Sequence, residues 1–181
     1  MSQPVLVAYA TKKESTHEVA DALAARLREL GHEVDVRPAA EVGTLAPYGG
    51  VVVGGALYAG RWHRDARHFL ATHRDELARR PVAVFAMGPA TLEEAEVQGS
   101  RKQLDHALAK EHQLEPVSVT IFGGVIDPAR LRFPLNRIPA ADARDWDAIV
   151  AGLNQYLRLR SIPIGMKLFE TVEEMEAIPK I

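Results

Sequence analysis

The sequence contains no cysteine. This absence excludes disulfides, thiolate nucleophiles and cysteine-ligated iron–sulfur clusters together. No apolar run approaches the roughly 20 residues that a membrane-spanning helix needs, so we expect no integral membrane segment. The first residues, MSQP, carry no basic stretch and lead directly into an apolar run. We therefore expect no signal peptide and a cytoplasmic location.

Neither sign of charge is in large excess, because the formal net charge is only −2. Without an overall basic field to attract phosphates, we expect no nucleic-acid partner. A hydrophobic content of 47% with 25% charged residues is typical of a globular protein and not of a disordered one. A length of 181 residues suits one ordinary domain and a little more. We expect a domain over residues 1–160 and a C-terminal extension over 161–181.

Predicted strands and helices alternate along the chain. Val5–Ala10 is a continuous apolar run, as in a strand buried on both faces of a parallel sheet. Four more strands are expected near residues 33–38, 51–53, 82–87 and 116–125, with helices at 16–30, 62–77, 100–110 and 146–157. This pattern predicts an α/β fold with a doubly wound five-stranded parallel sheet and helices on both faces. The strand order expected is 2-1-3-4-5, and the proline-containing stretch 127–142 is expected to be a surface excursion.

The first predicted strand is followed by the loop Thr11–Thr16, which reads TKKEST, and then at once by a helix. Free N–H groups and the positive end of the helix dipole favour an anion there, most often a phosphate. The same residues also fit a capping box, in which Ser15 and Glu18 would satisfy the first turn themselves. Glu14 adds a negative charge, and the loop has no glycine. The spacing alone leaves both interpretations open.

In a sheet of the expected order, ligands bind outside the carboxyl ends of the strands where the order reverses. That edge would bring together three loops, Thr11–Thr16, Gly55–Trp62 and Met87–Ala90. The first loop suits a phosphate, and the other two suit a flat apolar group. Tyr58 is a candidate for stacking on such a group, whereas Trp62 could stack there or simply pack beneath its helix.

Several blocks of the sequence occur together in a known family. The chain resembles the flavodoxin-domain proteins grouped with menaquinone-dependent protoporphyrinogen oxidase in the blocks VLVAYATKKEST, VVVGGALYAGRW, PVAVFAMGP, FGGVIDPARLRF and RDWDAI. The resemblance covers roughly Pro4 to Leu157. The resemblance implies a flavodoxin-like fold and non-covalent FMN. It implies that the phosphate loop of this chain consists of Thr11, Lys12, Lys13, Glu14, Ser15 and Thr16. In the family this loop usually has a glycine at the position of Glu14. It implies that the flavin ring contacts Ala56, Leu57, Tyr58, Ala59, Gly60, Trp62, Met87 and Gly88.

The leading hypothesis is a redox protein that passes electrons through FMN to a partner protein or a small organic acceptor. One alternative is a flavin-free binding or assembly module of the same fold, which Glu14 favours. Another is a quinone-dependent enzyme similar to protoporphyrinogen oxidase. We expect the C-terminal extension to contact a redox partner or to open a fused domain, and the sequence leaves a homo-oligomer open. No catalytic residue or metal site is assigned, and the histidines are expected to be solvated helix residues.

Overall fold

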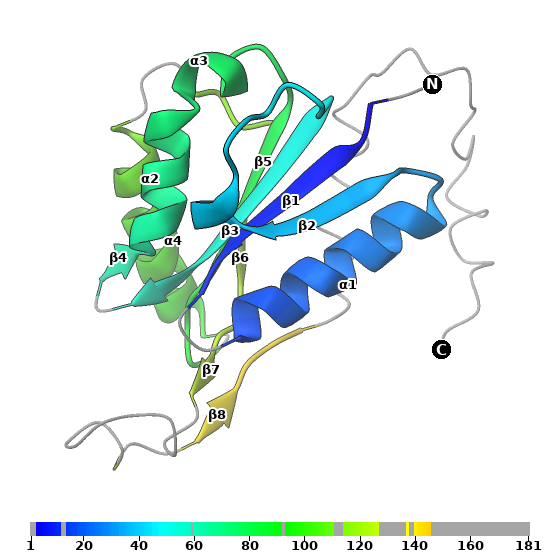
Figure 1. Cartoon of the computed structure of the whole chain (residues 1–181). Helices are drawn as coiled ribbons and strands as arrows, with labels where there is room; N and C mark the ends of the chain where they lie inside the picture. The colour runs from blue at the N-terminus through cyan, green and yellow to red at the C-terminus, as the bar shows by residue number, and fades with distance from the viewer. Residues whose placement is uncertain are drawn as a thin grey trace, which may run out of the picture.

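Five parallel strands form the central sheet in the order β2-β1-β3-β5-β6 (Figure 1). The computed structural model describes residues 3–11, 14–58, 60–91, 93–110, 114–126, 137 and 140–145. The strands are β1 (Val5–Ala10), β2 (Val34–Pro38), β3 (Gly50–Tyr58), β5 (Val82–Met87) and β6 (Ser118–Phe122). A short β4 (Arg61–Trp62) pairs antiparallel with β3. Counted over the parallel strands, the predicted order 2-1-3-4-5 is confirmed.

Helices cover both faces of this sheet, as predicted. α1 (Ser15–Glu29) lies on one face, and α2 (Arg64–Thr72), α3 (Arg74–Leu77) and α4 (Glu94–Leu108) lie on the other (Figure 1). Side chains along a strand alternate between faces, so Val5 and Val7 of β1 pack toward α1 while Leu6 packs toward α2 and α4. A parallel strand with apolar residues on both faces is therefore buried throughout, which explains the continuous apolar run.

Gly54 leaves space for an aromatic ring on the adjacent strand in the middle of the sheet. A Cβ atom built at this position would overlap the ring of Phe85 on the neighbouring strand. Phe85 in turn lies against Phe122 of β6, with ring centroids 5.6 Å apart. Only glycine leaves room for this packing in the central strand.

The predicted helix over 62–77 is in fact two helices, and the break occurs at a buried histidine. Nε2 of His73 lies 3.1 Å from the carbonyl oxygen of Val42, and Nδ1 lies 3.3 Å from a carboxylate oxygen of Glu76. His63 is also buried, so the prediction that the histidines are solvated is wrong for these two, although it holds for His68. A buried imidazole needs polar partners, and here it joins the helical layer to the loop after η1 (Ala39–Glu41).

Other boundaries differ from the prediction in informative ways. α4 begins at Glu94 rather than near residue 100. The acidic residues Glu94 and Glu96 therefore lie in the first turn of the helix. The last predicted strand ends at Phe122, and after Gly123-Gly124 a separate β7 (Val125–Ile126) pairs with β8 (Ala141–Asp142). Apart from residues 137 and 140, the rest of the predicted excursion lies outside the described residues, as do the predicted helix over 146–157 and the extension 161–181. Within the described part of the chain, none of the helices has the length and hydropathy of a membrane span.

Candidate functional site

The carboxyl ends of four parallel strands lie at one edge of the sheet. The register pairs Ala10 of β1 with Gly55 of β3, and Ala56 of β3 with Met87 of β5. Met87 pairs in turn with Phe122 of β6. The order reverses between β1 and β3, so this edge is the topological switch point at which ligands bind in such sheets. In Figure 1 the first turn of α1, the β3–β4 hairpin and β7–β8 all lie toward this end of the sheet.

Glu14, the N-cap residue just before α1, has a left-handed backbone conformation with a φ of 65°. This conformation strains a residue with a Cβ atom and is ordinarily occupied by glycine. The carbonyl of Glu14 accepts the amide hydrogen of Glu18, at 3.0 Å, so the helix starts at Ser15. The side chain of Glu14 does not cap the first turn. Ser15 is thus the first helical residue and not the cap, and the capping-box interpretation is wrong.

Thr16 has a completely buried side chain in this first turn, with an exposed fraction of 0%. Its hydroxyl oxygen finds no hydrogen-bond partner among the residues that the structure describes. An unpaired buried hydroxyl costs stability, on the order of 1–3 kcal/mol, unless something else pairs with it. First-turn N–H groups likewise have no acceptor within the helix. The turn therefore offers donors that suit a bound anion. Of the other predicted loop residues, Lys12 and Lys13 lie outside the described part.

The second predicted loop is a β-hairpin that extends β3 beyond the edge of the sheet. Tyr58 and Arg61 pair across it, and Gly60 makes the turn with a φ of 76°. Tyr58 is 49% exposed, so about half of its surface is open to solvent. Leu57 and Ala56 are half-buried behind it, and Ala59 lies outside the described residues.

Trp62 returns from the hairpin into the core, where it is 1% exposed. Its indole Nε1 donates to the carbonyl of Gly55 at 3.0 Å. The structure therefore places Trp62 in the packing role considered above, fixing the base of the hairpin that presents Tyr58.

Replacing Trp62 by phenylalanine is expected to lower the free energy of unfolding by about 2–3 kcal/mol, because the Gly55 carbonyl loses its donor in a buried place. Urea unfolding followed by circular dichroism measures this change. A variant as stable as the parent would mean that the indole hydrogen bond contributes nothing to the hairpin.

Met87 and Gly88 form the start of the third loop. Met87 is buried in the core on the side of α1, so its side chain packs inside the protein rather than at the surface. The amide of Gly88 donates to the carbonyl of Phe122 at 3.0 Å, and a Cβ atom at Gly88 would approach Leu57 within 3.0 Å. The second and third loops therefore touch each other through Leu57 and Gly88.

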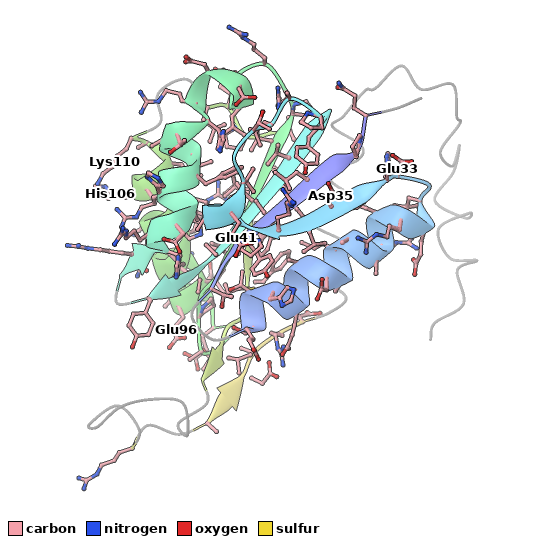
Figure 2. All side chains as sticks on the ribbon, viewed as in Figure 1. Glu33, Asp35, Glu41, Glu96, His106 and Lys110 are labelled. Carbon is pink, nitrogen blue, oxygen red and sulfur yellow. The ribbon has the colours of Figure 1, made fainter. Side chains whose placement is uncertain are left out.

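Several carboxylates lie around this edge. Figure 2 shows Glu41 beyond the end of β2 and Glu96 on the first turns of α4, and Glu14 and Glu18 lie at the start of α1. Within the described residues, no group of three or more histidine and carboxylate side chains could hold a metal ion. Arg144 meets part of this charge: it hydrogen-bonds to Glu18 and, at 2.6 Å, to Asp142. The hydrogen bonds from Arg144 to Asp142 hold the pKa of Asp142 below its usual value.

The model of the flavodoxin domain family matches residues 6–138, which is most of the chain. The chain belongs to the flavodoxin domain family. None of the curated proteins matches its sequence.

Solved structures share the fold of this flavodoxin domain at low sequence identity. Oxidised flavodoxin 2 from Bacillus cereus is 20% identical with a TM-score of 0.58, covering 86% of this chain and 98% of that one. Flavodoxin 1 from the same organism is 16% identical with a TM-score of 0.57, covering 86% and 97%. Rubredoxin oxygen:oxidoreductase from Desulfovibrio gigas is 13% identical with a TM-score of 0.57, and the match covers 87% of this chain but only 36% of that longer one.

Two contacts of the flavodoxin domain were not predicted from the sequence. Arg144 belongs to the block RDWDAI, but nothing in the spacing indicated that it reaches Glu18. Tyr9 and His17 stack with ring centroids 4.4 Å apart, and His17 lies 3.3 Å from Asp21. Tyr9 is the next-to-last residue of β1 and His17 follows the loop by one residue, so their closeness follows from the strand–loop–helix geometry and could have been found by building it.

Proposed function

We propose that this flavodoxin domain binds FMN non-covalently and transfers electrons through it to a partner protein or a small organic acceptor. The observation that carries the proposal is the buried hydroxyl of Thr16, which lacks a partner within the described residues in the first turn of α1. A phosphate at this point would accept from that hydroxyl and from first-turn N–H groups. When bound, FMN supplies the redox chemistry, and the protein supplies its binding and orientation.

The remaining residues fit the rest of the cofactor. The loop Thr11–Thr16 is proposed as the phosphate cradle, with Lys12 and Lys13 contributing positive charge. Tyr58 is the proposed stacking partner of the flavin ring, supported by its 49% exposure on a hairpin that Trp62 anchors. The backbone between Tyr58 and Gly60 is the proposed hydrogen-bonding partner of flavin N5. Ala56, Leu57, Met87 and Gly88 would then support the ring from behind.

The test is the flavin content of the purified chain. The absorbance spectrum is expected to show bound flavin, and protein stripped of flavin is expected to take up FMN far more tightly than riboflavin, which lacks the phosphate. A colourless protein that takes up no FMN after stripping would contradict the proposal.

The second candidate is a flavin-free module of the same fold that binds or assembles with other proteins. The observation that favours it is Glu14, a carboxylate-bearing residue in a backbone conformation that glycine ordinarily occupies, just before α1. FMN uptake distinguishes the two candidates. If the chain is a flavin-free module, the unchanged protein takes up no FMN, and the variant Glu14→Gly gains uptake.

The identity of the electron acceptor distinguishes a quinone-dependent enzyme from an electron carrier. An enzyme similar to quinone-dependent protoporphyrinogen oxidase would turn over steadily with a quinone, whereas an electron carrier would pass its electrons only to a protein. The sequence blocks support the first, and the 36% share of the Desulfovibrio gigas chain supports a domain that works beside another one. We propose residues 161–181 as the docking tail or the opening of such a domain, and a cytoplasmic location.

A further inference from the structure

Arg144 joins a segment late in the chain to the first turn of α1. Its guanidinium binds Glu18 on that turn and Asp142 on β8. The side chain of Arg144 is 14% exposed, whereas that of Glu18 is 56% exposed. The arginine is therefore the part of this ion pair that the protein holds in place, and the glutamate is the part that would otherwise move freely in water.

The backbone around Arg144 is fixed by the same edge of the sheet that forms the site. The amide of Ala143 donates to the carbonyl of Gly124 at 3.0 Å, and the amide of Gly124 donates to the carbonyl of Pro89 at 2.8 Å. A Cβ atom at Gly123 would overlap the carbonyl of Ala143, so these segments lie in direct contact. The loops after β5 and β6 thus set the position from which Arg144 reaches α1.

Glu18 brings a second carboxylate to the first turn of α1, where it would oppose a bound anion. It lies one turn after Glu14, which already brings one negative charge to the start of α1. A carboxylate near the first turn can accept from its free N–H groups, and it repels a phosphate electrostatically. Pairing with the partly buried Arg144 opposes both effects.

We propose that Arg144 is a positioning residue for the phosphate site: it holds Glu18 away from the first turn of α1 and neutralises its charge, so that the turn accepts the phosphate of FMN. This inference rests on the proposed function. Arg144 acts through Glu18, and its effect is confined to ligands that carry a phosphate.

The experiment compares FMN and riboflavin binding by the full chain, the variants Arg144→Gln and Glu18→Gln, and the double variant. Quenching of flavin fluorescence measures each affinity. Arg144→Gln is expected to weaken FMN binding about tenfold at low ionic strength, an effect that shrinks with added salt, and to leave riboflavin binding unchanged. Glu18→Gln is expected to bind FMN as tightly as the parent or up to about threefold tighter. In the double variant, FMN affinity is expected to return to within about twofold of the parent.

A matched control lies at the other end of the same helix. Arg26 pairs with Glu29 at 2.8 Å, with exposed fractions of 17% and 61% that resemble those of the proposed pair. Arg26→Gln makes the same change in net charge and is expected to leave FMN affinity unchanged.

Three results would overturn the inference: an Arg144→Gln variant that binds FMN as tightly as the parent, a double variant as weak as Arg144→Gln, or a weakened Glu18→Gln variant. The last of these does not depend on Arg144→Gln being folded. If the parent chain binds no FMN at all, the proposed function fails and the inference with it.

Discussion

A valine at position 16 is expected to stabilise the ligand-free protein and at the same time to weaken FMN binding by about 10- to 100-fold. The buried hydroxyl of Thr16 has no partner among the described residues, and valine has nearly the same shape without the polar atom. Removing an unsatisfied buried hydroxyl should raise the free energy of unfolding by about 1 kcal/mol or more. A hydrogen bond to a charged phosphate contributes about 1.5–3 kcal/mol, and binding loses it.

Urea unfolding of the stripped protein and an FMN titration measure the two opposite effects. Thr16→Ser is the matched control, because it keeps the hydroxyl and should keep most of the FMN affinity. If Thr16→Val loses stability and keeps its affinity, the hydroxyl has a structural partner and does not face the phosphate.

Glycine at position 14 is expected to improve both stability and FMN affinity. The left-handed conformation of Glu14 costs about 1–2 kcal/mol in a residue with a Cβ atom, and glycine relieves it at some cost in unfolded-state entropy, for a net gain of about 1 kcal/mol. The substitution also removes a negative charge from the start of α1, which should tighten FMN binding about tenfold at low salt.

Glu14→Ala separates the two causes. It removes the charge but keeps the Cβ atom, so it should gain FMN affinity without gaining stability. Affinity that is unchanged in both variants would mean that the carboxylate points away from the phosphate. Stability that is unchanged in Glu14→Gly would mean that the left-handed conformation is not strained in the folded protein.

The sheet and the elements of the site could be predicted because their signals are local. The run Val5–Ala10 is apolar at every position, which only a strand buried on both faces requires, and the alternation of such runs with helices then restricts the strand order. Because the expected strands are parallel, their carboxyl ends lie at the same edge of the sheet. The three loops could therefore be assigned to one edge from the sequence.

The features that could not be predicted depend on contacts between distant residues. The pattern STHE fits a capping box with Ser15 as the N-cap, but Glu14 is the N-cap, in a left-handed conformation, and Ser15 is the first helical residue. Glu18 then pairs with Arg144, 126 residues away. Likewise, the sequence left both a ligand contact and core packing open for Trp62, and its hydrogen bond to the carbonyl of Gly55 shows the packing role. Propensity and periodicity do not contain this information.

The amide spectrum of the ¹⁵N-labelled protein during an FMN titration tests the central claim most directly. The claim is that the phosphate lies on the first turn of α1 while the ring lies against the β3–β4 hairpin. The account predicts that the amides of Ser15, Thr16 and His17 show the largest downfield changes with FMN, and that riboflavin perturbs the hairpin but not these three. FMN binding that leaves these amides unmoved, or no binding at all, would contradict it.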